Sequence, residues 1–251
     1  MSTEKDKWEY FGKNDPYFAV ATFDKFKAEN LTDELKSDFF QLGEDQVVKL
    51  WCEVEGAFGP FAPKRALDFG CGVGRVVIPL ASRTGHVTGV DISENMIDEA
   101  RRNCAQHNLG NTDFLQTEAF MTENVSKFDF VHSSIVFQHI EPGAGMPIFR
   151  RILSLLEEDG VGALQFTISG LDGNPLSRTF TAYRDFPAIY KLRNKVKGEK
   201  DEPLIPMYLY DLNQIVYELY KNGCHEIKMR FYDHGLLGVM LMFRKRELEA
   251  F

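Results

Sequence analysis

Short apolar runs alternate with helix-like segments between residues 65 and 170. The apolar runs predict strands at Arg65–Phe69, Val87–Val90, Thr112–Gln116, Phe128–Ser133 and Val161–Thr167. The segments between them predict helices over Val76–Ser82, from the capping residue Ser93 onward, and over Pro147–Leu156. Strands that alternate with helices favour a mostly parallel sheet with helices on both faces.

The two flanks follow other patterns. Residues 1–64 are rich in aromatic and charged side chains, and the spacing of apolar residues over Leu42–Phe58 fits one face of a helix. Near the other end, Asp211–Asn222 predicts a helix, and Glu226–Tyr232 and Val239–Arg244 predict strands. With no helix between them, these strands pair antiparallel or stand apart in the sheet. The connection over residues 171–206 is long enough for a functional cap or a plain surface insertion.

Composition narrows the class of protein. The chain has 251 residues, 44% hydrophobic and 26% charged, which suits a single globular domain with embellishments. A net charge of -8 disfavours nucleic acid as a partner, and the basic cluster at Lys191–Lys200 is diluted by acidic neighbours. The four cysteines form no CxxC pair, so neither a metal site nor a disulfide framework is expected. No leader or bilayer-length apolar run is visible; we expect a cytoplasmic location without a membrane partner, and no residue indicates the oligomeric state.

Candidate chemistry is concentrated where the first predicted strand ends. Gly70, Gly72 and Gly74 stand at alternate positions between that strand and the next helix, and Asp91 ends the second strand. Glycine permits positive φ and close approach of a ligand, and a helix start offers free N–H groups. A carboxylate at the tip of the second strand can accept the hydroxyl protons of a ribose. Arg75 stands where a dinucleotide-binding loop would carry its last glycine.

With these motifs the chain resembles the class I S-adenosylmethionine (SAM)-dependent methyltransferases. Leu67–Gly74 is similar to the first motif of the family, and Asp91 to its ribose-binding acid. The resemblance implies a Rossmann-like α/β fold: a seven-stranded, mostly parallel sheet with an antiparallel last strand, N-terminal helices and a cap insertion. The chain would then be one domain, 1–251. Its parts would be a helical or lid region (1–64), a cofactor-binding half (65–170), a cap-like insertion (171–206) and a C-terminal helix with two strands (207–251).

The resemblance also implies roles for two further segments. In Phe114–Ala119, Glu118 would accept a hydrogen bond from the adenine amino group, and the Ala119 backbone would donate to a ring nitrogen. In Phe128–Ile140, Ser133 or Ser134 would contact the methionyl group. The cofactor-binding residues expected on this basis are Asp68, Gly70, Cys71, Gly72, Gly74, Arg75, Asp91, Ile92, Met96, Glu118, Ala119, Ser133 and Ser134.

His139 is the candidate catalytic base. It follows the fourth predicted strand, on the side where open α/β sheets bind ligands, and a neutral imidazole can take a proton near neutral pH. The alternative is a histidine that packs or hydrogen-bonds within its loop. The aromatic run Trp8–Phe18 would be a lid over the cofactor or an ordinary part of the core.

The expected reaction is transfer of a methyl group from SAM to an oxygen or nitrogen of a small-molecule acceptor, leaving S-adenosylhomocysteine (SAH). A protein or RNA acceptor stays open as an alternative. Two other classes are weighed against it, a nicotinamide-dependent oxidoreductase and a non-catalytic partner protein with the SAM-binding fold. Arg75 in the glycine loop argues against the first, and intact motifs argue against the second.

Overall fold

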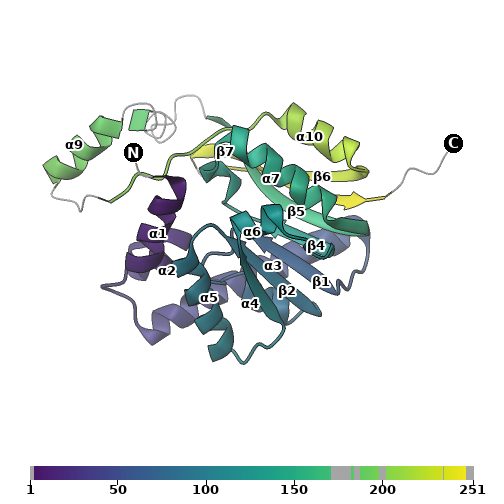
Figure 1. Cartoon of the computed structure of the whole chain (residues 1–251), viewed down its shortest axis with the longest axis horizontal. Coiled ribbons are helices and arrows are strands. Elements are labelled where there is room, and N and C mark those ends of the chain that lie inside the picture. The colour runs from purple at the N-terminus through teal and green to yellow at the C-terminus, as the bar shows by residue number, and fades with distance from the viewer. Residues whose placement is uncertain (1–2, 171–181, 184–186, 198–201, 234, 247–251) are drawn as a thin grey trace.

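A single twisted sheet forms the centre of the molecule in the computed structural model, which describes residues 3–170, 182–183, 187–197, 202–233 and 235–246. The sheet has seven strands in the order β3-β2-β1-β4-β5-β7-β6 (Figure 1). Strands β1 to β5 pair in parallel, and β7 runs antiparallel between β5 and β6. The predicted fold class is therefore confirmed. The strands are β1 (Arg65–Phe69), β2 (His86–Asp91), β3 (Thr112–Gln116), β4 (Phe128–Ser133), β5 (Leu156–Gly170), β6 (Cys224–Asp233) and β7 (Leu236–Lys245).

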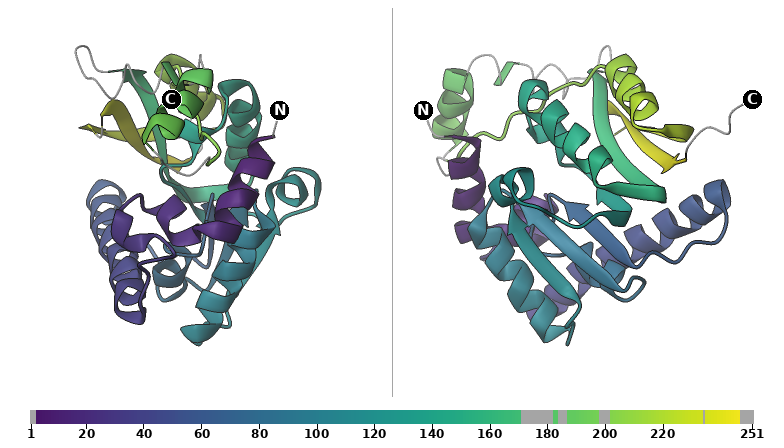
Figure 2. Two further views of the ribbon diagram at one scale, coloured as in Figure 1. Left: turned by 90° about the vertical axis from the view of Figure 1, so that its left-hand side faces the viewer. Right: turned by 45° about the vertical axis from the view of Figure 1, so that its right-hand side comes forward.

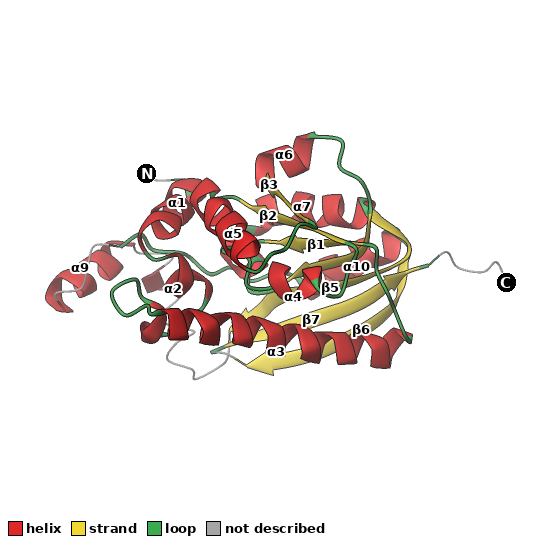
Figure 3. Cartoon of the chain, turned by 90° about the horizontal axis from the view of Figure 1, so that it is seen from below, coloured by secondary structure: helices red, strands yellow, loops and turns green. Residues whose placement is uncertain are grey.

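Helices cover both faces of this sheet. On one face, α3 (Asp33–Phe58), α4 (Val77–Ala81) and α5 (Glu94–Gln106) enclose an apolar cluster with strand residues such as Phe130, and Figure 3 shows α3 lying along the sheet. On the other face lie α6 (Thr117–Thr122), α7 (Pro142–Ser154) and α10 (Leu212–Lys221). Their cluster is rich in aromatic rings; the Phe137 and Phe166 ring centres are 4.6 Å apart.

Several helix boundaries differ from the predictions, and α3 begins at Asp33 rather than at Leu42. The helix expected to begin at Pro147 begins at Pro142, because proline suits the first turn of a helix, where its missing N–H has no partner to lose. Pro147 lies inside α7 instead. The helix after the glycine loop is shorter than expected and spans only Val77–Ala81. Ser93 does cap α5 as predicted, since its side chain accepts a hydrogen bond from Met96 N.

The N-terminal part forms α1 (Glu4–Asn14), α2 (Pro16–Val20) and the 3-10 helix η1 (Asp24–Phe26) before α3. Helices α1 and α2 contact α5, and η1 contacts α2 and α3, beyond the ends of the strands (Figure 2). Of the expected cap over 171–206, the structure describes 182–183, α9 (Pro187–Lys197) and 202–206; the rest lies outside the described residues. Among the described residues, no helix has the length and apolar character needed to span a bilayer.

Candidate functional site

The glycine loop after β1 has the backbone conformation that its sequence predicts. Gly70, Gly72 and Gly74 have φ angles of 77°, 53° and 85°, a region that residues with a side chain rarely adopt. The amides of Gly70 and Cys71 both donate to the carbonyl of Val90, at 2.7 and 3.0 Å. The loop is thereby tied to the end of β2. These two amides are therefore engaged within the protein.

Asp91 ends β2 and lies directly beside this loop. Its carboxylate accepts hydrogen bonds from Gly72 N at 2.9 Å and from Ser93 N at 3.0 Å. Burial raises the pKa of the Asp91 carboxyl to about 6, and the N–H groups of Ser93, Gly72 and Ile92 oppose the rise. A carboxylate has lone pairs for about four hydrogen bonds, so Asp91 retains capacity to accept a ribose hydroxyl. The donor and acceptor chemistry of this corner fits a nucleoside.

Three other residues expected at the cofactor have their side chains against the protein. Asp68 Oδ1 lies 2.7 Å from Nδ1 of His132, and both side chains are buried. Arg75 packs on α3, with its guanidinium carbon 5.9 Å from the ring centre of Phe39. Met96 is buried in the apolar cluster beneath the N-terminal helices.

The end of β3 differs in part from the expectation. Glu118 and Ala119 lie in the first turn of α6 rather than in an extended segment, and the Glu118 side chain is exposed. Gln116 stands opposite Asp91 in the register of β2 and β3, and its amide contacts Glu94. Gln116 is thus a polar residue of the crevice that the sequence did not single out, although strand register could have indicated it.

The loop after β4 forms the opposite wall. Ser133 Oγ donates to the carbonyl of Phe69 at 2.8 Å, and Ser134 Oγ donates to Oε1 of Gln165 at 2.6 Å. Ile135 follows with φ of 61°, which is unfavourable for a β-branched residue. Val136 then packs so closely on Gly70 that a Cβ there would come within 2.2 Å of it. Backbone strain of this kind is concentrated at functional loops.

His139 lies at the end of the 3-10 helix η2 (Phe137–His139). Its Nδ1 is 3.2 Å from the carbonyl oxygen of Pro206, which can only accept, so Nδ1 carries the proton in the neutral ring. Its Nε2 is 3.0 Å from Nε2 of Gln138, whose amide then donates to the imidazole lone pair. Oε1 of Gln138 accepts from Thr167 Oγ1, which agrees with that amide orientation. The basic nitrogen is therefore Nε2, and an acceptor hydroxyl would take the place of the Gln138 amide there.

Among the described residues, no group of three or more His, Cys, Asp and Glu side chains is placed to hold a metal ion.

The strand order, the glycine loop and the buried acid define a Rossmann-like protein, and the loop and the acid lie at the carboxyl end of its sheet, where such folds bind nucleosides. Residues 66–160 match the sequence family described as a methyltransferase domain. Within residues 66–160 the chain is therefore similar to the class I SAM-dependent methyltransferases, enzymes whose methyl donor is SAM.

Known proteins show the same similarity. The chain is similar to the ubiquinone biosynthesis O-methyltransferase of Acinetobacter baylyi, with 28% identity over 57% of each chain. It is 42% identical over 62 residues to a 23S rRNA uracil-C5 methyltransferase of Methylococcus capsulatus, which covers 25% of this chain and 14% of that protein. The chain thus spans well under two thirds of these relatives. Its fold matches the SAH-bound magnesium protoporphyrin IX methyltransferase of Synechocystis PCC 6803, with a TM-score of 0.62, 21% identity, and coverage of 97% of this chain and 100% of that one.

Proposed function

We propose that this chain transfers a methyl group from SAM to an oxygen or nitrogen of a small-molecule acceptor, in the cytoplasm. The observation that carries the proposal is the buried Asp91 carboxylate, which joins Gly72 of the glycine loop to the start of α5 and keeps acceptor capacity for a ribose. SAM supplies an activated methyl group on a sulfonium.

The remaining roles fall to residues along the ends of the strands. Asp91 would bind the ribose. The adenine side would be lined by Glu118, Ala119 and Gln116. The methionyl side would be formed by the backbone of Ser133 and Ser134. Holding donor and acceptor in line can supply roughly 7–11 kcal/mol of the barrier reduction, so orientation is the main task of the protein. His139 would take the acceptor proton on Nε2, a contribution of about 10²–10⁴ in rate for acceptors that need a base.

A small acceptor is supported by charge and by the extent of the similarities. A chain with a net charge of -8 repels a polyanion. The similarity to the rRNA methyltransferase covers 25% of the chain, whereas the similarity to the ubiquinone-pathway enzyme covers 57%. Matches to other RNA methyltransferases cover 24–36% of the chain, so the RNA alternative rests on shorter similarities.

Isothermal calorimetry with SAM and SAH tests the cofactor assignment. We expect both to bind, and no heat at millimolar ligand would end the proposal. Titration with NADH under the same conditions tests the oxidoreductase alternative. For the acceptor, incubation with methyl-labelled SAM and separate small-molecule, RNA and protein fractions of a cell extract should label the small-molecule fraction. Label in RNA or protein alone would overturn the acceptor class.

A further inference from the structure

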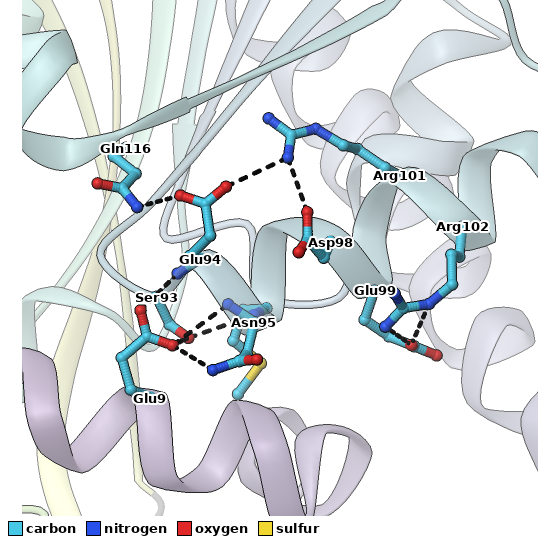
Figure 4. Close-up of polar contacts among 10 residues, drawn as sticks. Glu9, Ser93, Glu94, Asn95, Asp98, Glu99, Arg101, Arg102 and Gln116 are labelled. Carbon is cyan, nitrogen blue, oxygen red and sulfur yellow. Dashed lines mark hydrogen bonds and ion pairs between the residues drawn. The ribbon is translucent and has the colours of Figure 1, made fainter.

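One side chain of the N-terminal helix binds the start of α5. The Glu9 carboxylate on α1 accepts hydrogen bonds from Glu94 N at 2.8 Å, Asn95 N at 3.2 Å, Ser93 Oγ at 3.0 Å and Asn95 Nδ2 at 2.6 Å (Figure 4). A carboxylate at a helix N-terminus is favoured by the free N–H groups and by the helix dipole. Glu9 therefore attaches α1 firmly to α5 through a single group.

This attachment is next to the ribose-binding acid. Ser93 is shared between two carboxylates, because its N–H donates to Asp91 and its hydroxyl donates to Glu9. Ser93 is completely buried. A group that holds α1 in place is thus joined to Asp91 through one residue.

The rest of the N-terminal segment continues over the glycine loop. Gly12 approaches α5 so closely that a Cβ would lie 2.8 Å from Ser93 Oγ and 2.9 Å from Asn95 Cβ. Val20, at the end of α2, packs on Gly72, where a Cβ would lie 2.6 Å from its side chain. A ligand can touch that face of Gly72 only after Val20 has moved.

The same helix also reaches the acceptor side of the crevice. Trp8 precedes Glu9 on α1, and its ring centre lies 5.6 Å from that of His139 in an edge-to-face arrangement. Glu9 contacts the segment after β2, and Trp8 contacts the segment after β4. Helix α1 therefore bridges the segment that carries Ser93 and the segment that carries His139.

We propose that residues 4–20 form a clamp over the cofactor crevice, and that Glu9 is the positioning residue that holds the clamp shut. SAM enters and SAH leaves only while the bonds between Glu9 and α5 are broken. The inference rests on the proposed function, because it takes the crevice beside Asp91 as the SAM site. It assigns Glu9, which no motif of the family marks in the sequence, to the control of cofactor exchange.

The test measures SAH release by stopped-flow fluorescence in a Trp51→Phe background, where Trp8 is the only remaining tryptophan of the chain's two. Glu9→Gln places an amide NH₂ against N–H donors, so SAH should leave about tenfold faster, the effect of losing about one charge-assisted hydrogen bond. Glu4→Gln is the matched control, since Glu4 lies on the same helix and, within the described part of the chain, its side chain bonds only to Lys7. It should release SAH at the parental rate.

A second variant loosens the clamp without touching Glu9. Gly12→Ala brings a Cβ against α5, whereas Gly56→Ala in α3 meets nothing within 4 Å and serves as its control. Gly12→Ala should speed SAH release, and hydrogen exchange of the α1 amides should rise in both clamp variants. If SAH binds the parent, Glu9→Gln and Gly12→Ala and leaves all three at the same rate, the clamp is overturned while the proposed function stands. A parent protein that binds no SAH would overturn the proposed function, and the clamp with it.

Discussion

His132 Nδ1 lies 2.7 Å from Asp68 Oδ1, and the two side chains are 1% and 4% exposed. The pair joins β4 to β1 at the point where the glycine loop begins, because Asp68 and His132 stand opposite each other in the register of these strands. A carboxylate only accepts, so the imidazole proton is on Nδ1. Its Nε2 is buried, and within the described chain it has no hydrogen-bond partner. The pair therefore joins the two strands directly before the glycine loop.

Asp68→Ala should therefore act on stability. It leaves a buried imidazole N–H without an acceptor, which should lower the free energy of unfolding by about 2 kcal/mol. Urea denaturation followed by circular dichroism measures this. The chain contains a matched control in the pair of His86 and Asp113, 2.9 Å apart, whose carboxylate side chain is 74% exposed. Asp113→Ala should cost less than about 1 kcal/mol. Equal losses in the two variants would contradict the structural role of Asp68.

The pH dependence of cofactor binding should follow Asp91. Its pKa is raised to about 6 mainly by burial, and the ionised form is the better acceptor for ribose hydroxyls. SAH affinity should accordingly fall as the pH drops from 7 to 5, by at most about tenfold per pH unit. Calorimetry at several pH values checks this, and Asp91→Ala should bind weakly with no such decline. A parent affinity that is constant between pH 7 and pH 5 would remove Asp91 from the ribose.

The same raised pKa has a consequence for the unliganded protein. The folded state holds the Asp91 proton more tightly than the unfolded chain, in which the pKa of this carboxyl is near 3.8. Folding stability from this group is therefore lowest above about pH 6 and is regained as the pH falls from about 6 towards 4. To isolate the effect, the Tm of Asp91→Ala is subtracted from the Tm of the parent, at pH 7 and again at pH 5. The difference should favour the parent more at pH 5, and the opposite trend would refute the raised pKa.

His139 should affect turnover and leave cofactor binding intact. Once an acceptor has been identified, His139→Gln should lower kcat by about 10²–10⁴ if that acceptor needs a base, with SAH affinity unchanged. The His139 ring also contacts Trp8, Pro206 and Gln138, so the substitution can lower stability as well as catalysis. Measuring the free energy of unfolding of the same variant separates the two effects. Unchanged kcat would leave His139 as a packing residue of the loop.

Local signals predicted most of the sheet and the proximity of the glycine loop to Asp91. The bounds of β1, β3 and β4 follow from apolar runs, and the glycines with Asp91 meet because the carboxyl ends of neighbouring parallel strands share one edge. Contacts between distant segments were beyond the sequence. Asp68 and His132 are 64 residues apart, and Glu9 lies 85 residues before Glu94. Hydrophobic periodicity does not indicate which donors the Glu9 carboxylate contacts once α1 has packed on α5. The aromatic run Trp8–Phe18 therefore did not predict this contact.

Ile135 provides the last prediction, because its φ of 61° lies where a β-branched side chain is strained. Such a residue costs of the order of 1–3 kcal/mol, and glycine would relieve the strain while adding freedom to the unfolded chain. Ile135→Gly should therefore raise the free energy of unfolding by about 1 kcal/mol. Ile140→Gly is the control, since Ile140 has φ of −111° and should be destabilised instead. Because the strained residue lies between Ser134 and Val136, relief should also loosen the loop and weaken SAH binding. Stabilisation without any change in affinity would show that the strain has no part in holding the cofactor.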